Sequence, residues 1–214
     1  MLNPSGKRHK SNKDWLLEHV NDPYVQKAKQ EGYRSRAAYK LLEIDAKDRL
    51  IKPGSVIVDL GSAPGSWCQA AVRRMGANLG GGKIIAIDLL EMQGMSHVQF
   101  IQGDFSEDEV LAQVEDALGG AKVDLVMSDM LPNMSGVANI DSPRSIYLCE
   151  LAADFAVNHL KADGKFLTKA YQGPGYQEFF QQLKQQFKTV VSRKPEASRD
   201  RSAEIFLLAS GLRE

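Results

Sequence analysis

The sequence predicts an α/β protein whose mostly parallel sheet is covered by helices on both faces. Short apolar runs rich in Val and Ile, typical of strands buried on both faces, alternate along the chain with stretches of helical spacing. The last two strand-like runs have no helix between them, so we expect them to pair antiparallel. A chain of 214 residues is long enough for one sizeable core. We therefore expect one domain over residues 33–214, preceded by a basic, partly mobile arm over residues 1–32.

The expected elements follow one another in a regular order. Strands are predicted near residues 56–58, 83–88, 97–102, 123–129, 165–169, 187–193 and 203–209. Helices are predicted over residues 35–50, from 67 onward, and over 106–118, 142–160 and 175–186. Ser106 and Glu109 have the spacing of a capping box, so Ser106 is expected to cap the third of these helices. Together the elements make a doubly wound, seven-stranded sheet with an antiparallel last strand.

Composition and residue usage narrow the class of protein. Hydrophobic residues make up 43% of the chain and charged residues 25%, which is ordinary for a soluble globular protein. No apolar stretch approaches the length of a membrane span, and the four histidines lack metal-ligand spacing, so we expect neither a membrane nor a metal partner. The two cysteines, Cys68 and Cys149, form no C-x-x-C pair, which favours a reduced, cytoplasmic protein. We expect it to act as a monomer.

A glycine turn follows the first predicted strand. Gly61 and Gly65 let the backbone turn sharply and approach a ligand closely, and Pro64 stiffens the turn between them. A strand, a glycine turn and a helix N-terminus form the crevice in which open α/β sheets bind nucleotide-like ligands. The spacing G-x-x-P-G differs from the G-x-G-x-x-G fingerprint of dinucleotide sites, so the turn gives little support to an NAD enzyme. A tight connection without a ligand is the alternative for this turn taken alone.

Acidic residues stand at the ends of the next predicted strands. Asp88 ends the second strand, at about the separation at which such folds place a carboxylate for ribose hydroxyls. Asp104 follows the third strand, and Asp129 ends the fourth. The glycine turn, Asp88 and Asp104 at three successive strand ends would suit an adenosyl group lying across the carboxyl edge of the sheet, and Asp129 is expected at the same edge.

Charge is unevenly distributed, although the formal net charge is zero. Basic residues outnumber acidic ones by twelve to seven over residues 1–53 and by six to two over 184–201, whereas residues 85–164 carry three basic and fourteen acidic side chains. One interpretation is chance segregation on solvated faces. The other is that both basic ends converge into a cationic groove for a polyanion, while the acidic middle includes carboxylates for a cationic cofactor.

Five ordered motifs stand out along the chain: Tyr33–Leu41, Asp59–Trp67, Gln102–Phe105, Ser128–Gly136 and Lys194–Glu204. Together they resemble the motifs of the FtsJ (RrmJ) family of ribose 2′-O-methyltransferases. The compact length and the basic arm are similar to the bacterial branch that acts on large-subunit ribosomal RNA. The resemblance implies a Rossmann-like, S-adenosylmethionine-dependent methyltransferase fold. It also implies 2′-O-methylation of a uridine ribose in 23S ribosomal RNA, presented within the large ribosomal subunit.

The resemblance carries site residues over position by position. The catalytic set of the family falls on Lys40, Asp129, Lys169 and Glu204, with Lys169 as the proton acceptor. Its S-adenosylmethionine contacts fall on Gly65, Trp67, Asp88, Asp104 and Asp129. Two positions depart from the family pattern, because Ser66 stands where a second glycine is usual and Phe206 where a tyrosine is usual. We expect Ser66 to tighten the helix start or to crowd the methionine moiety, and no essential hydrogen bond to depend on a hydroxyl at position 206.

Methyl transfer to a ribose hydroxyl requires the oxygen to be aligned behind the sulfonium methyl group and its proton to be removed. A lysine accepts that proton only in its neutral form, which burial or a neighbouring cation favours. The hypothesis is that burial, Lys40 and the sulfonium favour neutral Lys169. Asp129 would orient that amine, and Glu204 would pair with Lys40. The two carboxylates oppose this arrangement, because they favour the charged amine.

Eight basic residues near the two ends of the chain are predicted to bind the RNA. They are Lys7, Arg8, Lys10, Arg34, Arg36, Lys194, Arg199 and Arg201. Contacts between such side chains and phosphates imply that binding weakens steeply as salt rises.

Competing functions can be weighed from the same residues. A dehydrogenase of similar fold would need the dinucleotide fingerprint and usually a Tyr-x-x-x-Lys pair, and the sequence has neither. A non-catalytic RNA-binding module would be expected to lack members of the catalytic set, yet all four positions are filled. Transfer RNA and messenger cap substrates stay open within the family, because no motif here reads a base.

Overall fold

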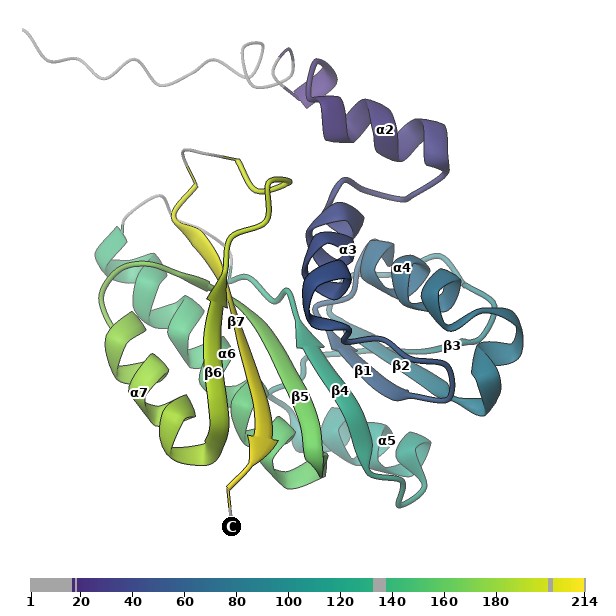
Figure 1. The fold of residues 1–214 in the computed structure, drawn as a ribbon. Coiled ribbons are helices and arrows are strands. Elements are labelled where there is room, and N and C mark those ends of the chain that lie inside the picture. The colour runs from purple at the N-terminus through teal and green to yellow at the C-terminus, as the bar shows by residue number, and fades with distance from the viewer. Residues whose placement is uncertain (1–16, 18, 133–137, 200–201, 214) are drawn as a thin grey trace, which may run out of the picture.

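The computed structural model of the chain describes residues 17, 19–132, 138–199 and 202–213. One seven-stranded sheet has the order β3-β2-β1-β4-β5-β7-β6 (Figure 1). Its strands are β1 (Val56–Leu60), β2 (Lys83–Asp88), β3 (Val98–Gln102), β4 (Val123–Ser128), β5 (Leu160–Tyr171), β6 (Phe187–Arg193) and β7 (Glu204–Leu212). The first five pair in parallel, and β7 is antiparallel to both β5 and β6. The predicted sheet with an antiparallel last strand is therefore confirmed.

Helices cover both faces of the sheet, because its strands are apolar on both sides. In β1, Ile57 and Val58 are both fully buried but belong to two different core clusters, one on each face. One cluster includes residues of α3 (Ala37–Asp48), α4 (Ser66–Met75) and the short 3-10 helix η1 (Ala77–Gly81). The other includes residues of α5 (Asp108–Leu118), α6 (Ala138–His159) and α7 (Tyr176–Gln186). This alternation explains why the strands read as continuous apolar runs.

Three helix starts differ from their predicted positions by two residues or more, the first being that of α3, which begins at Ala37 rather than at residue 35. The α5 helix begins at Asp108, and its N-cap is Glu107 rather than Ser106. The cap predicted at Ser106 is wrong, because the backbone N–H and the hydroxyl of Ser106 both donate to the carboxylate of Asp104. The α6 helix begins at Ala138 and includes Pro143, so it starts before the predicted residue 142.

The parallel register brings the ends of the central strands to one edge. Leu60 at the end of β1 pairs with Ile87 of β2 on one side and with Ser128 of β4 on the other. Ser128 in turn pairs with Thr168 of β5. The residues that come next along each strand therefore project at the same edge of the sheet.

The N-terminal helices and the loop after β6 lie side by side at this edge (Figure 1). The first of them, α2 (Pro23–Glu31), precedes α3, and the backbone N–H of Ala197 donates to the carboxylate of Glu43 on α3. Tyr24 donates its hydroxyl to the same carboxylate, at 3.1 Å. Ala28, Tyr39 and Ala197 form a small apolar cluster beneath these contacts. The two basic regions of the sequence thus meet in space. No helix in the described part of the chain combines the length and the hydropathy that a membrane span requires.

Candidate active site

The glycine turn after β1 is held against the neighbouring strands. The backbone N–H groups of Gly61 and Ser62 both donate to the carbonyl of Ile87 on β2. Gly61 has φ +76°, and a Cβ there would lie 2.8 Å from the backbone of Met130, which follows β4. Only glycine satisfies both the left-handed backbone and this close approach. The turn is therefore wedged between the ends of β2 and β4.

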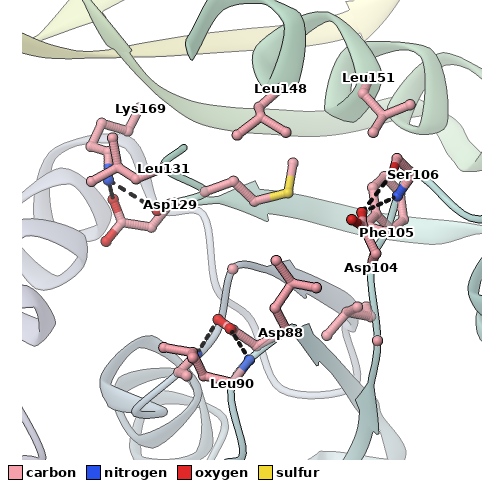
Figure 2. A pocket seen from close by; sticks show the side chains of 16 residues that line it. Asp88, Leu90, Asp104, Phe105, Ser106, Asp129, Leu131, Leu148, Leu151 and Lys169 are labelled. Atoms are coloured by element: carbon pink, nitrogen blue, oxygen red, sulfur yellow. Dashed lines mark hydrogen bonds and ion pairs between the residues drawn. The ribbon is translucent and has the colours of Figure 1, made fainter. Parts of the chain in front are cut away.

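A cavity of about 440 Å³ opens beside this turn at the carboxyl edge of the sheet (Figure 2). Asp88, Asp104 and Asp129 stand around it, and apolar side chains including Leu148 and Leu151 of α6 face them. The structure thus brings together the three acids predicted at successive strand ends. An acidic rim on a partly apolar cavity suits a ligand that carries both positive charge and an apolar ring.

Asp88 is oriented by two backbone groups. One of its carboxylate oxygens accepts from the N–H of Ala63 in the glycine turn, and the other accepts from the N–H of Leu90, each at 2.8 Å. Because each carboxylate oxygen offers more than one acceptor site, Asp88 retains capacity for a hydroxyl donor from a ligand.

Asp104 is held in its negative form by its neighbour. The hydroxyl of Ser106 donates to it at 2.6 Å and the N–H at 2.9 Å, and these bonds hold the pKa of the Asp104 carboxyl below its usual range. Hydrogen bonds to a carboxylate favour the charged form. Ser106 also lines the cavity, so it contributes to the site rather than to the helix cap.

Two of the residues predicted to contact the cofactor lie outside the cavity wall. Trp67 is buried, and its indole N–H donates to the carbonyl of Ala37 at the start of α3. Gly65 lies at the end of the turn with φ +100°, covered by Arg34 and Met92. Neither residue is among those that line the cavity.

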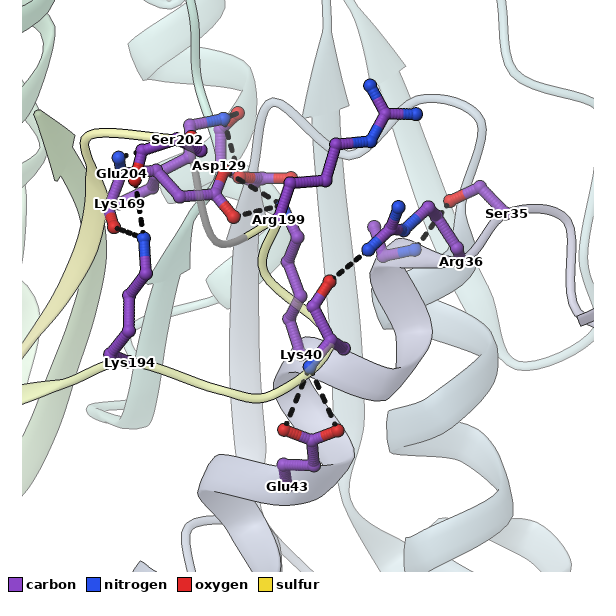
Figure 3. A network of polar contacts seen from close by, with 12 residues as sticks. Ser35, Arg36, Lys40, Glu43, Asp129, Lys169, Lys194, Arg199, Ser202 and Glu204 are labelled. Carbon is purple, nitrogen blue, oxygen red and sulfur yellow. Dashed lines mark hydrogen bonds and ion pairs between the residues drawn. The ribbon is translucent and has the colours of Figure 1, made fainter. Parts of the chain in front are cut away.

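The four predicted catalytic residues form two ion pairs close to the cavity (Figure 3). Lys40 of α3 lies 2.7 Å from Glu204 at the start of β7, and Lys169 of β5 lies 2.6 Å from Asp129 after β4. The Lys169 amine also donates to the backbone carbonyl of Asp129, at 2.9 Å. Lys169 and Asp129 both line the cavity. The convergence that the sequence hypothesis required is therefore present in the structure.

Burial and neighbouring charges shape the titration of acids around these pairs. Burial opposes ionisation of Glu204, but Lys40, with smaller contributions from Ser198 and Lys169, outweighs it, so the pKa of Glu204 lies below its usual range. In β1, burial together with the charges of Asp129 and Asp88 raises the pKa of Asp59 to about 7. One Asp59 oxygen accepts from the Cys68 thiol at 3.1 Å, while the other has no hydrogen-bond partner in the described part of the chain.

Four of the residues predicted to bind RNA are engaged within the chain. Arg34 donates to two backbone carbonyls, and Lys194 donates to those of Ser202 and Glu204. Arg36 donates to Asp22 and to the carbonyl of Ala197, and Arg199 lies 3.8 Å from the same Asp22. The other four, Lys7, Arg8, Lys10 and Arg201, lie outside the described residues.

The two departures from the family pattern are both accommodated by packing. Ser66 is buried, and its hydroxyl accepts a hydrogen bond from Ser35 at 2.9 Å. Phe206 is fully buried with its ring 5.9 Å from that of Trp67, and the Lys40 ammonium lies 5.8 Å from the Phe206 ring. Both replacements therefore join the N-terminal segment or α3 to the rest of the site.

Two side chains beside the ion pairs were not singled out from the sequence. Tyr171 lies two residues beyond Lys169, on the same face of β5 and opposite Glu204 in the register. Burial, with the charges of Glu204 and Asp129, raises its pKa to about 12. Ser198 is buried, and its side chain helps to lower the pKa of Glu204. The two-residue period of a strand would have placed Tyr171 next to Lys169.

Similarity to known proteins identifies the family. The family model described as FtsJ-like methyltransferase matches residues 33–212. The chain belongs to the FtsJ-like methyltransferase family. The predicted family is thereby confirmed, and with it the prediction that the chain is a methyltransferase.

Full-length relatives in bacteria are similar to the chain. Ribosomal RNA large subunit methyltransferase E from Azoarcus sp. (strain BH72) is 58% identical over 207 residues, which cover 97% of this chain and 100% of that protein. The protein of the same name from Neisseria meningitidis serogroup C (strain FAM18) is 57% identical, over 96% of this chain and 98% of its own length.

Solved structures share the fold. The crystal structure of a ribosomal RNA methyltransferase from Plasmodium falciparum matches with a TM-score of 0.76 and 32% identity, covering 84% of this chain and 98% of that one. A Streptococcus mutans methyltransferase in complex with SAH matches with a TM-score of 0.51 and 14% identity, over 83% and 96% of the two chains, which shows the fold alone. The Rossmann-like methyltransferase fold predicted from the sequence is thus confirmed.

Proposed function

We propose that this FtsJ-like methyltransferase transfers a methyl group from S-adenosylmethionine to the 2′-hydroxyl of a uridine ribose in 23S ribosomal RNA, within the large ribosomal subunit. The observation that carries the proposal is the Lys169–Asp129 pair, 2.6 Å apart, at the wall of an acid-rimmed cavity. The proteins named ribosomal RNA large subunit methyltransferase E support the substrate, because they are 54–58% identical to this chain over nearly its full length.

The residues around the cavity fit the proposed cofactor. Asp88 has spare acceptor capacity for ribose hydroxyls, and the hydrogen-bonded Asp104 provides a second fixed negative charge. Gly61 and Gly103 also line the cavity, where a Cβ would collide with the backbone of Met130 at Gly61 and with the side chain of Val110 at Gly103. S-adenosylmethionine would supply an electrophilic methyl group on a positively charged sulfur, and its charge would favour a neutral amine nearby.

The geometry of Lys169 suits the role of proton acceptor. Its amine donates to the Asp129 carbonyl at 2.9 Å and lies 2.6 Å from the Asp129 carboxylate. A neutral amine held by its hydrogen bond to this carbonyl has a lone pair that can take the proton of the ribose hydroxyl. Asp129 thus orients the amine, although its carboxylate also favours the charged form.

The second ion pair has a separate task in this proposal. Lys40 and Glu204 hold α3 against the start of β7, directly beside the reacting groups. We propose that Lys40 and Glu204 position the ribose, while Lys169 carries the proton.

The proposed RNA surface lies where the two basic regions meet, around α2, α3 and the loop after β6. Lys194 donates to the backbone carbonyls of Ser202 and Glu204, which do not cancel its charge. Arg199 keeps about a third of its side chain exposed, so it is placed to reach a phosphate. We also propose that the RNA-binding arm ends and the catalytic domain begins at residue 33, because the family match starts there.

The proposed activity is tested by supplying labelled S-adenosylmethionine with three acceptors in parallel: large ribosomal subunits, naked ribosomal RNA and transfer RNA. The expected result is label in the large subunit, located by digestion to the 2′-position of one uridine. If label appeared only in transfer RNA, the substrate would be transfer RNA rather than ribosomal RNA. If the protein bound the cofactor but labelled none of the three acceptors, a non-catalytic RNA-binding role would be supported.

A further inference from the structure

Arg34 joins two loops that border the cavity. Its guanidinium donates through Nη1 to the carbonyl of Pro64 at 2.8 Å and through Nη2 to the carbonyl of Gly94 at 3.1 Å. Pro64 belongs to the glycine turn after β1, and Gly94 to the loop after β2. The same two loops contribute four residues to the cavity wall: Gly61, Ala63, Leu89 and Leu90.

The guanidinium lies directly over the turn. A Cβ placed on Gly65 would be 2.7 Å from Arg34 Nη1 and 2.8 Å from the sulfur of Met92. Arg34 is therefore packed onto Gly65 together with a residue from the second loop. The absence of a side chain at Gly65 is what allows this contact, which is an independent reason for glycine at that position.

The backbone of Arg34 is anchored as well. Its N–H donates to the side-chain oxygen of Gln69 on α4 at 2.7 Å, and the next residue, Ser35, donates its hydroxyl to Ser66 at 2.9 Å. These bonds dock the segment before α3 onto the first turn of α4. Arg34 thus has little freedom to swing toward a nucleic acid phosphate without releasing both loops.

We propose that Arg34 is a positioning residue for the cofactor, because it sets the separation of the two loops that border the cavity. Its fork of donors spans both carbonyls at once, which the single ammonium of lysine does not do. This role replaces the phosphate contact that the basic sequence around Arg34 predicts. The inference rests on the proposed use of S-adenosylmethionine.

The test compares two arginines that each donate to two backbone carbonyls. Arg73 on α4 donates to the carbonyls of Glu31 and Gly32 at 3.0 and 3.3 Å and stacks over Tyr33 at 4.1 Å, but it contacts neither loop. The variants are R34K, R34Q and, as the matched control, R73K. For each full-length protein, we would measure the Kd for S-adenosylhomocysteine, the KM for S-adenosylmethionine, kcat, the thermal midpoint, and RNA affinity at several salt concentrations.

The expected result is a rise of about tenfold or more in the Kd for S-adenosylhomocysteine and in the cofactor KM for both R34K and R34Q. RNA affinity and its salt dependence should stay within twofold of wild type, as should kcat at saturating cofactor. R73K should leave the cofactor Kd unchanged even if its thermal midpoint falls.

Three outcomes would overturn the inference. The first is unchanged cofactor affinity in R34K and R34Q, and the second is a loss of cofactor affinity in R73K as large as that in the Arg34 variants. The third is that R34Q keeps its cofactor affinity while the slope of log RNA affinity against log salt concentration falls by about one, as expected for loss of a phosphate contact. If R34K does not fold, R34Q makes the same comparison with R73K. Failure of the wild-type protein to bind S-adenosylhomocysteine would instead refute the proposed cofactor, which separates the two ideas.

Discussion

The ammonium of Lys40 lies 2.7 Å from a carboxylate oxygen of Glu204, although 164 positions separate the two residues along the chain. The pair joins α3 to the start of β7 and is mostly shielded from solvent, with side-chain exposures of 14% and 9%. Partners that are shielded in this way cost stability when either is left alone. The contact therefore links folding of the domain to the geometry of the site.

Replacing Glu204 with Gln should destabilise the protein by about 3 kcal/mol at pH 7, because Lys40 then loses the carboxylate that balances its charge. The folded-state pKa of Glu204 is lowered, so its contribution is present above the unfolded value of about 4.5 and is lost as pH falls through the folded value. Urea unfolding at pH 7 and pH 4 would measure this. The difference in free energy of unfolding between wild type and E204Q should be smaller at pH 4 than at pH 7.

The exposed Glu109 on α5 offers a control for that experiment. The E109Q variant removes the same charge without a buried partner, so its stability should track that of wild type at both pH values. If the free energies of unfolding of wild type and E204Q differed as much at pH 4 as at pH 7, the effect could not be assigned to the ionised carboxylate.

Replacing Lys169 with Met should reduce methyl transfer by roughly 100- to 10,000-fold, the range expected for loss of a general base. Cofactor affinity should stay within a few-fold of wild type, because Lys169 is proposed to act on the ribose proton. Single-turnover transfer to large subunits and S-adenosylhomocysteine binding would be measured side by side.

Lys165 provides a matched control for Lys169 on the same strand. Its amine donates to the backbone carbonyls of Asp48 and Arg49, and it lies in the middle of β5, four residues before Lys169 and outside the cavity lining. K165M should therefore alter stability and leave the transfer rate near wild type. Transfer by K169M at the rate of K165M would remove Lys169 from the role of proton acceptor.

Asp59 should make the protein less stable as pH rises. Burial, followed by the charges of Asp129 and Asp88, raises its pKa to about 7 in the folded state, against about 4 when unfolded. Between these two pH values the folded protein holds a proton that the unfolded protein has lost. The free energy of unfolding therefore falls by up to about 4 kcal/mol from pH 4 to pH 7 and levels off above pH 7.

The D59N variant isolates this effect, because Asn keeps the shape of the side chain without its ionisation. Chemical unfolding at pH 5, 6, 7 and 8 should show a wild-type stability that declines relative to D59N. Parallel stability profiles for the two proteins across this range would show that Asp59 does not take up a proton on folding.

The sheet could be predicted because each strand carries its own signal. The apolar runs at Val56–Leu60 and Val123–Ser128 are buried on both faces, so they needed no tertiary information to be recognised. The acids at the strand ends followed from the same alignment, since parallel strands end at one edge. That reasoning located Asp88, Asp104 and Asp129 correctly around one cavity.

Side-chain partners were harder to predict, because several choices satisfied the same local pattern. Ser106 had the spacing of a helix cap, yet its hydroxyl bonds to Asp104, which lies closer in sequence and in a turn. Arg34 and Arg36 had the composition of a phosphate-binding segment, yet both guanidinium groups bond to backbone carbonyls brought close by tertiary folding. Charge and spacing alone do not distinguish these outcomes.

Asp88 should govern cofactor affinity through the shape of the glycine turn. Its two oxygens accept from the N–H groups of Ala63 and Leu90, and an amide offers only one oxygen for the two donors. D88N should therefore lose a charged hydrogen bond worth about 1.5–3 kcal/mol and weaken S-adenosylhomocysteine binding by roughly ten- to a hundredfold.

Asp124 supplies the control for D88N, because it also accepts from a backbone N–H, that of Val56 at 2.8 Å, but near the opposite end of the sheet. D124N should lower the free energy of unfolding and leave the affinity for S-adenosylhomocysteine unchanged in titration calorimetry. If D124N weakened binding as much as D88N, the loss in D88N would reflect general destabilisation. A selective loss in D88N would instead show that the carboxylate shapes the cavity, since both variants give up the same kind of backbone bond.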